Sequence, residues 1–168
     1  MRILISAAVA AAGTLGFGLV AQAEAPSQRL TADAAQAIVE GCKRNAIAGE
    51  RNHAIAVVDS GGHPVASLRM EGNTPGIMAF AFEKAKAAAL WGFPTSGMEQ
   101  ATKNAPGFAD APYVVALGGG VPIYSADGTV LLGGVGTSGA SPADDAACAE
   151  AGIRAAGLSP QRAGAPGR

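Results

Sequence analysis

The stretch His53-Ala-Ile-Ala-Val-Val-Asp-Ser-Gly-Gly-His-Pro-Val-Ala-Ser-Leu-Arg-Met70 decides the fold of this chain, because it predicts a β-hairpin. Two runs rich in β-branched and apolar residues flank the segment Ser60–His63, which has the composition of a turn. Pairing about this turn places His53 opposite Arg69 or Met70. Both alternating sets of side chains in the first run are apolar, so we expect a strand covered on both faces, either by helices or by another subunit.

The segments around the hairpin carry further helix and strand patterns. Caps, apolar spacing and terminating Gly or Pro predict four helices, at residues 31–47, 76–91, 96–104 and 141–158. Alternation and turn residues predict three more strands, at residues 113–117, 121–124 and 129–136. The order α-β-β-α-α-β-β-β-α predicts a single α+β domain, with a five-stranded, mainly antiparallel sheet packed with helices.

The stretch Gly134-Val-Gly-Thr-Ser-Gly139 has the G-x-G-x-x-G spacing of a dinucleotide-binding loop. Such a loop needs a second parallel strand and an acidic residue about 20 positions later that holds the ribose. That position falls beyond the last predicted helix. Moreover, Asp144 and Asp145 occupy the helix turn that would face the pyrophosphate, and their carboxylates would repel it. We therefore expect a tight strand-to-helix turn and no NAD or nucleotide.

The N-terminus has the pattern of a secretory signal peptide. Arg2 precedes an apolar run, residues 3–20, and Ala21-Gln-Ala23 has the small-x-small form that signal peptidase accepts. A transmembrane anchor is the alternative, because the apolar run is close to spanning length. Glycines within the run and a cleavage site directly after it favour export. We expect removal of residues 1–23 and a periplasmic or secreted protein, with no membrane association after cleavage.

The rest of the chain has room for one domain, which we place at residues 24–158. Residues 159–168, SPQRAGAPGR, have the composition of a disordered tail. The whole chain carries 12 basic and 13 acidic side chains, a formal net charge of −1, and no basic stripe. Nucleic acid is therefore not an expected partner.

Two cysteines, Cys42 and Cys148, lie on the small, apolar sides of the first and last predicted helices. In an oxidising compartment they would form a disulfide if those helices lie side by side, and otherwise they would be two buried thiols. No histidine or third cysteine stands at ligand spacing from either one, so we expect no metal site from them.

Several stretches together resemble the GlcG/HbpS-like family, the haem-binding or haem-degrading domain also found at the C-terminus of PduO-type proteins. They are LTADAAQAIVEGC, IAVVDSGGHPVASLRM, EKAKAAALWGFPTS, GGGVPIYSADGTVLLGGVGTSGAS and DDAACAEAGI. The resemblance spans roughly residues 29 to 158. It implies a profilin-like domain that assembles into dimers or larger homo-oligomers. For exported members it also implies haem or ferric-iron binding, as a haem sink or a redox and stress sensor.

The resemblance also indicates which residues would contact haem. Lys84 matches the family's Lys-Ala step on the central helix, Thr95 its Pro-Thr step after that helix, and Arg69 the Arg of the second strand. We expect Thr95 to supply a contact and Lys84 or Arg69 to pair with propionates. An axial ligand is normally His, Met, Cys or Tyr. Neither histidine falls in a motif that fixes it as that ligand, and His53 is kept as a candidate.

Two other classes of function stay open. One is an enzyme acting on a small organic acid, aldehyde or aromatic metabolite in a pocket between the central helix and the sheet. Such an enzyme would use Lys84, Arg69 or Asp59. No nucleophile, base and orienting group are identified that would make such catalysis specific. The other is a structural accessory subunit whose loops serve assembly.

Overall fold

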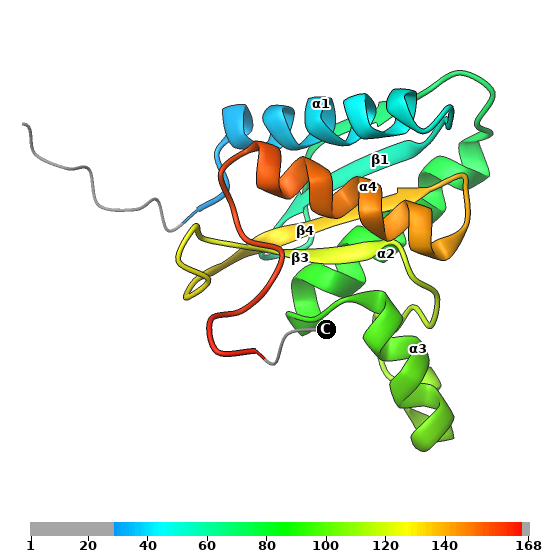
Figure 1. Ribbon diagram of the computed structural model, residues 1–168. Helices are drawn as coiled ribbons and strands as arrows, with labels where there is room; N and C mark the ends of the chain where they lie inside the picture. The colour runs from blue at the N-terminus through cyan, green and yellow to red at the C-terminus, as the bar shows by residue number, and fades with distance from the viewer. Residues whose placement is uncertain (1–28, 166–168) are drawn as a thin grey trace, which may run out of the picture.

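A computed structural model describes residues 29–165, and Figure 1 shows that they form an α+β fold. Within this range there are four α-helices, one 3₁₀ helix and four strands. In chain order they are α1 (Ala32–Ala48), β1 (Ala54–Asp59), β2 (Pro64–Arg69), α2 (Pro75–Trp91), α3 (Thr95–Asn104), η1 (Pro106–Asp110), β3 (Gly120–Tyr124), β4 (Leu131–Ser138) and α4 (Pro142–Ala155). The predicted signal peptide lies outside the described residues. None of the described helices is long and apolar enough to cross a membrane.

The sheet is antiparallel throughout, with the strand order β2-β1-β4-β3. The hairpin register predicted from the sequence is confirmed. Ala54 pairs with Arg69, and Met70 N donates a hydrogen bond to His53 O over 3.1 Å. One irregularity in the β1–β2 pairing, between Val57 and Val58, shifts the register next to the turn.

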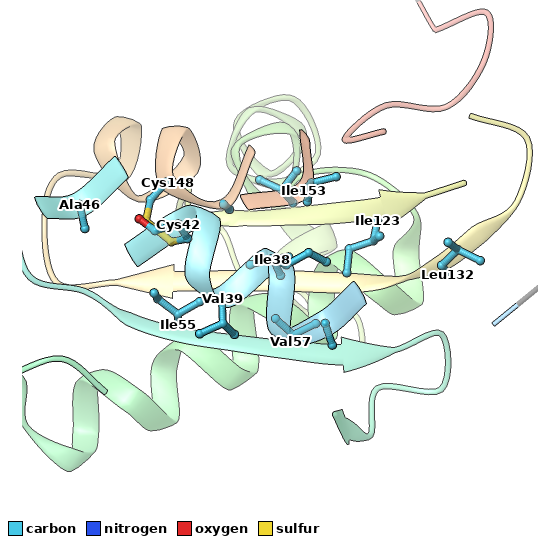
Figure 2. Close-up of a cluster of buried hydrophobic side chains, with 14 of the residues drawn as sticks. Ile38, Val39, Cys42, Ala46, Ile55, Val57, Ile123, Leu132, Cys148 and Ile153 are labelled. Atoms are coloured by element: carbon cyan, nitrogen blue, oxygen red, sulfur yellow. A yellow bond between two sulfur atoms is a disulfide. The ribbon is translucent and has the colours of Figure 1, made fainter. Parts of the chain in front are cut away.

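Helices of the same chain cover both faces of the sheet. In Figure 1, α1 and α4 lie side by side on one face and α2 lies on the other. The first face holds the larger core, with Ile38 and Val39 of α1 packed against Ile55 and Val57 of β1 (Figure 2). On the second face, alanines of β1 pack on alanines of α2. The doubly apolar strand is therefore covered by helices, one of the two coverings that the sequence left open.

Glycines in β4 allow α2 to lie directly on the sheet. A Cβ placed on Gly134 would be 2.8 Å from Ala89 N, and one placed on Gly136 would overlap the backbone of Ala81 and Ala85. Backbone thus packs against backbone at these positions, as expected for a strand interrupted by glycine. The close approach leaves no room there for the metabolite pocket that the sequence placed between the central helix and the sheet.

Cys42 and Cys148 form a disulfide, with an S–S distance of 2.00 Å and a Cα–Cα distance of 4.6 Å. The bond joins α1 to α4 inside the larger core, where both residues are fully buried (Figure 2). Of the two states that the sequence left open, the structure therefore shows the bridge.

The predicted fifth strand, Tyr113–Leu117, is not present in the described structure. Tyr113 adopts a positive φ of 62°, which turns the chain, and Trp91 Nε1 donates a hydrogen bond to Pro112 O over 3.0 Å. Tyr113 and Leu117 are 57% and 38% exposed. The apolar pattern of this segment therefore marks a surface loop and not a strand of the sheet.

The C-terminal segment lies against the edge strand β3. The sequence predicts a disordered tail from residue 159, but Ser159 and Tyr124 exchange two backbone hydrogen bonds, of 2.8 and 3.1 Å. Further along, Ala163 N donates to Gly128 O over 2.8 Å. These bonds use backbone groups at the end of β3 and in the turn after it that would otherwise be unpaired.

Candidate functional site

The glycine-rich stretch after β4 forms the predicted strand-to-helix turn. Gly139 has a positive φ of 133°, and Ser141 is the N-cap of α4, with its hydroxyl accepting a hydrogen bond from Asp144 N over 3.2 Å. The two acids that follow point in different directions. Asp144 is half-exposed and pairs with Arg51 over 2.9 Å, whereas Asp145 is 2% exposed and turns into the protein.

Asp145 lies at the centre of a buried ion cluster, which we define as Lys84, Asp145 and His53. Lys84 Nζ donates to Asp145 Oδ2 over 2.9 Å and to Thr137 O over 3.0 Å. The ring centroid of Phe80 lies 4.9 Å from the same Nζ atom. Lys84 is 1% exposed and His53 is fully buried. Because a buried ammonium is stable only with strong partners, this geometry favours an ionised Lys84–Asp145 pair.

His53 is the third member of the cluster, and its ring nitrogens lack hydrogen-bond partners among the described residues. Its Nδ1 atom lies 3.1 Å from Asp145 Oδ1, but the approach lacks the direction of a hydrogen bond. Its Nε2 atom has no hydrogen-bond partner among the described residues. The Oδ1 atom of Asp145 instead accepts a hydrogen bond from Ala140 N over 3.1 Å. The cluster therefore ties α2 and the start of β1 to the glycine turn before α4.

Two consecutive glycines, Gly119 and Gly120, lie against this cluster where β3 begins. A Cβ on Gly119 would lie 2.8 Å from Lys84 Nζ and 2.9 Å from Asp145 Cβ, and one on Gly120 would lie 2.5 Å from Thr95 Cγ2. Thr95 is fully buried, and its hydroxyl accepts a hydrogen bond from Gly120 N over 2.9 Å. Thr95 is thus held to the start of β3, next to Lys84.

The structure brings together three of the four predicted haem-contact residues and leaves out the fourth. Lys84 and His53 meet at Asp145, and Thr95 lies nearby through Gly120. All three are buried, and Lys84 and Thr95 make hydrogen bonds in the interior, whereas neither ring nitrogen of His53 has a hydrogen-bond partner among the described residues. Arg69 is exposed on β2, where its guanidinium donates to Asn73 O. As the chain stands, only Arg69 of the four presents its polar group to solvent.

Asp145 is the residue of the cluster that the sequence did not single out. From the sequence, its carboxylate is interpretable only as a charge that repels phosphate. A signal was present, because adjacent residues of a helix point to different sides of it, so one of two consecutive acids can turn toward the body of the protein. Which of them turned inward depended on the position of Lys84, 61 residues away in the sequence.

An open polar cavity of about 400 Å³ lies beside the glycine turn. Arg51, Asn52, Asn73 and Gly139 are among its lining residues. Arg51 Nε is buried and has no hydrogen-bond partner among the described residues. The cavity is therefore lined by polar and charged groups, with Glu50 and Glu71 beside Arg51, and the cluster itself does not open into it.

The β1–β2 turn carries a second pair of titratable groups. Asp59 Oδ1 accepts hydrogen bonds from Gly61 N and His63 N, both over 2.9 Å, and lies 3.2 Å from His63 Nδ1. Partial burial raises the pKa of Asp59, but the hydrogen bonds from the His63 and Gly61 backbones and the His63 ring outweigh it and hold the pKa below its ordinary value. The carboxylate is therefore ionised at neutral pH.

Metal ligands do not gather anywhere in the part of the chain that the structure describes. No group of three or more His, Cys, Asp or Glu side chains there is arranged to hold a metal ion.

Comparisons with known proteins, by sequence and by structure, agree on one family. A family model described as haem degrading protein HbpS-like matches residues 30–154. Protein GlcG of Escherichia coli K12 is 37% identical over 110 residues, which cover 65% of this chain and 81% of GlcG. A double mutant of HbpS from Streptomyces reticuli has a similar structure, with 30% identity, a TM-score of 0.69, and coverage of 86% of this chain and 97% of HbpS. The crystal structure of a PduOC–haem complex has a TM-score of 0.71 at 22% identity, covering 80% of this chain and 99% of that one.

Proposed function

The chain belongs to the HbpS-like family, and we propose that it is an exported, oligomeric haem-binding protein that serves as a haem sink or redox sensor. The family match over residues 30–154 carries this proposal, because it includes every helix and strand of the sheet-and-helix domain except the last residue of α4. A PduOC–haem complex with the same fold supports it. Bound haem would supply an iron centre that changes oxidation state, which a redox sensor requires.

The axial ligand types present in the chain fit a surface haem site better than a buried one. Haem iron takes His, Met, Cys or Tyr from the protein. Both cysteines are in the disulfide, Met70, Met98 and Tyr124 are at most 6% exposed, and Met78 is partly exposed. His63 and Tyr113 are accessible, with the His63 side chain 79% exposed. The donor set therefore suits haem bound at the surface of this fold.

In a surface haem site, the buried ion cluster and Thr95 would mainly hold in place the elements that form the surface. Thr95 holds the start of β3, and Lys84 joins β4 to the first turn of α4 through Thr137 O and Asp145, so both support the surface without facing it. A direct contact from Thr95 to haem stays a prediction. It is tested by Thr95→Ser, which keeps the hydroxyl, against Thr95→Ala. Equal haem affinity in both would remove the hydroxyl from the list of contacts.

Exposed apolar side chains support self-association. Phe80 and Trp91 of α2, together with Leu117 of the loop before β3, are each 36% to 39% exposed. Exposed apolar patches on soluble domains mark interaction sites more often than chance. We therefore place the contact between copies on this side of the molecule. Sedimentation velocity of the chain without residues 1–23 tests it, and a monomer at tens of micromolar would contradict it.

The disulfide supports export. Such bonds persist in oxidising compartments and are rare in a reducing cytosol. Cys42 and Cys148 are bridged in this structure, and the sequence predicts a signal peptide at residues 1–23. A fusion of the N-terminal segment to a reporter enzyme active only after export tests the location. Reporter activity should depend on the residues around Ala23.

The test of haem binding is a hemin titration of the chain without residues 1–23. We expect a saturable Soret shift that stays with the protein through size-exclusion chromatography. Loss of the Soret band on the column would contradict specific binding, because hemin also adheres loosely to apolar surfaces. A parallel titration of lysozyme in the same serum-free buffer measures loose adherence of hemin, so that it can be distinguished from specific binding.

A second candidate function is favoured by the open polar cavity. Its size of about 400 Å³ and its polar lining suit a small polar metabolite. An enzyme or a binding protein for such a metabolite would retain it through purification. Native mass spectrometry tests this, and the protein mass alone, with hemin bound only on addition, would favour the haem sink.

A further inference from the structure

The Asp59–His63 turn is built so that one histidine nitrogen is held and the other is free. Besides its three contacts through Oδ1, Asp59 accepts a backbone hydrogen bond from Gly62 N over 3.0 Å and donates one to His63 O over 2.9 Å. Gly62 has a positive φ of 81°, which the turn needs. The imidazole therefore projects from a closed, multiply bonded turn.

The carboxylate selects the tautomer of the His63 ring. A carboxylate oxygen can only accept, so the 3.2 Å contact with Asp59 Oδ1 is a hydrogen bond in the tautomer whose Nδ1 carries the proton. In the neutral ring the lone pair then lies on Nε2, the atom that binds metals. A histidine held through Nδ1–H by a carboxylate is the arrangement found at metal-ligating histidines, where it orients the ring and raises its basicity. With 79% of the side chain exposed, Nε2 is open to an incoming ligand.

The surface next to His63 has the other features that a porphyrin needs. A Cβ on Gly62 would lie 3.1 Å from Lys86 Cγ and 3.8 Å from Leu90 Cδ1, so the turn rests on α2 at these residues. Lys86 Nζ lies 5.9 Å from the ring centroid of Tyr113. Leu90 is 40% exposed and Tyr113 is 57% exposed. An axial donor, two apolar side chains and a cation thus occupy one continuous surface.

We propose that His63 Nε2 is the axial ligand of haem iron in this protein, an inference that rests on the proposed haem-binding function. Asp59 is the positioning residue that holds the ring. Leu90 and Tyr113 provide apolar contact for the macrocycle, and Lys86 pairs with a propionate. The site differs from the set inferred from family resemblance, because His53, Lys84 and Thr95 are enclosed in the interior.

The experiment compares variants of the disulfide-bonded chain without residues 1–23 by hemin titration, Soret and visible spectra, and electron paramagnetic resonance of the ferric complex. We expect His63→Gly to weaken hemin binding at least about tenfold and to change the spin-state signature, since disturbing even an outer partner of a metal ligand costs about 10- to 100-fold in affinity. Added imidazole should restore the native spectrum in His63→Gly. Ser60→Ala, in the same exposed turn, is the matched control and should bind as the native chain does.

Two further variants test the positioning role of Asp59 and the propionate contact of Lys86. Asp59→Asn should weaken binding about tenfold while leaving a histidine-ligated spectrum. Lys86→Ala should weaken binding without any spectral change. Native-like melting curves for all variants would show that the fold is intact, as the exposure of His63 leads us to expect.

The possible failures are distinguishable. Hemin binding by His63→Gly with native affinity and spectrum would overturn the ligand assignment and leave the haem function standing. Loss of the native spectrum in Tyr113→Phe but not in His63→Gly would overturn it in favour of a phenolate ligand. Absence of stoichiometric binding by the native chain would refute the haem function and the assignment together.

Discussion

Replacement of Asp145 by Asn tests whether the buried ion cluster holds the fold together. The substitution keeps the size of the side chain and removes its charge, so Lys84 Nζ loses its carboxylate at 2.9 Å while staying 1% exposed. Breaking a buried ion pair by removing one partner costs about 3–5 kcal/mol. The ammonium keeps its bond to Thr137 O and its contact with Phe80, which places the expected loss near the lower end, about 3 kcal/mol.

The assay is urea unfolding followed by circular dichroism, supported by thermal melting. For a chain of this length, each kcal/mol shifts Tm by about 2–4 °C, so we expect a decrease on the order of 10 °C. The adjacent residue offers a matched control. Asp144 is half-exposed and pairs with Arg51 at the surface, where such pairs contribute about 1 kcal/mol or less, and Asp144→Asn should therefore be nearly silent.

A double variant separates charge from packing. Lys84→Met combined with Asp145→Asn removes both charges, so it should be more stable than Asp145→Asn alone, because the unpaired ammonium is gone. Equal stability of Asp145→Asn and Asp144→Asn would refute the reasoning. So would a double variant that is less stable than either single change.

Three further predictions concern other parts of the fold. Removing the disulfide with Cys42→Ala and Cys148→Ala should lower the free energy of unfolding by up to about 4–5 kcal/mol, since the bond spans 106 residues, and intact mass without reductant should be two hydrogens below the reduced mass in the native chain. Gly136→Ala should push α2 off the sheet and cost about 3 kcal/mol or more in urea unfolding, whereas Gly107→Ala, where an added Cβ meets nothing within 4 Å, should not. The pKa of Asp59 is lowered in the folded state, so its contribution is present above about pH 4 and lost as the pH falls further, and Asp59→Asn should flatten acid unfolding slightly below pH 4. A steeper acid transition in that variant would contradict the sign.

The sequence predicted most of the local structure correctly. The hairpin at residues 53–70 has the expected register, since turn residues and alternating apolar side chains together specify which residues face each other. Thr31 and Ser141 cap their helices, as short polar side chains before an apolar run should. Each of these features depends on a few neighbouring residues.

The sequence misjudged segments whose structure depends on distant parts of the chain. Tyr113–Leu117 has a strand pattern, but a strand must pair with a sheet edge, and β3, the next strand in the chain, forms the edge nearest in sequence. The edge of β3 is taken instead by Thr95 at its start and by Ser159 at its end. The tail has the composition of a disordered segment and is ordered where it finds that edge. Composition alone cannot show which backbone groups are left unpaired.

For the candidate site, the sequence by itself determined which residues can carry charge or bind iron, because that is a property of each side chain. Only the tertiary structure decided which are available. It placed His53, Lys84 and Thr95 in the interior and left His63 exposed with one nitrogen held by Asp59. Burial and pairing depend on residues far apart in the chain, such as Lys84 and Asp145. These two side chains can meet because the backbone of Gly119, which has no side chain, lies against both of them.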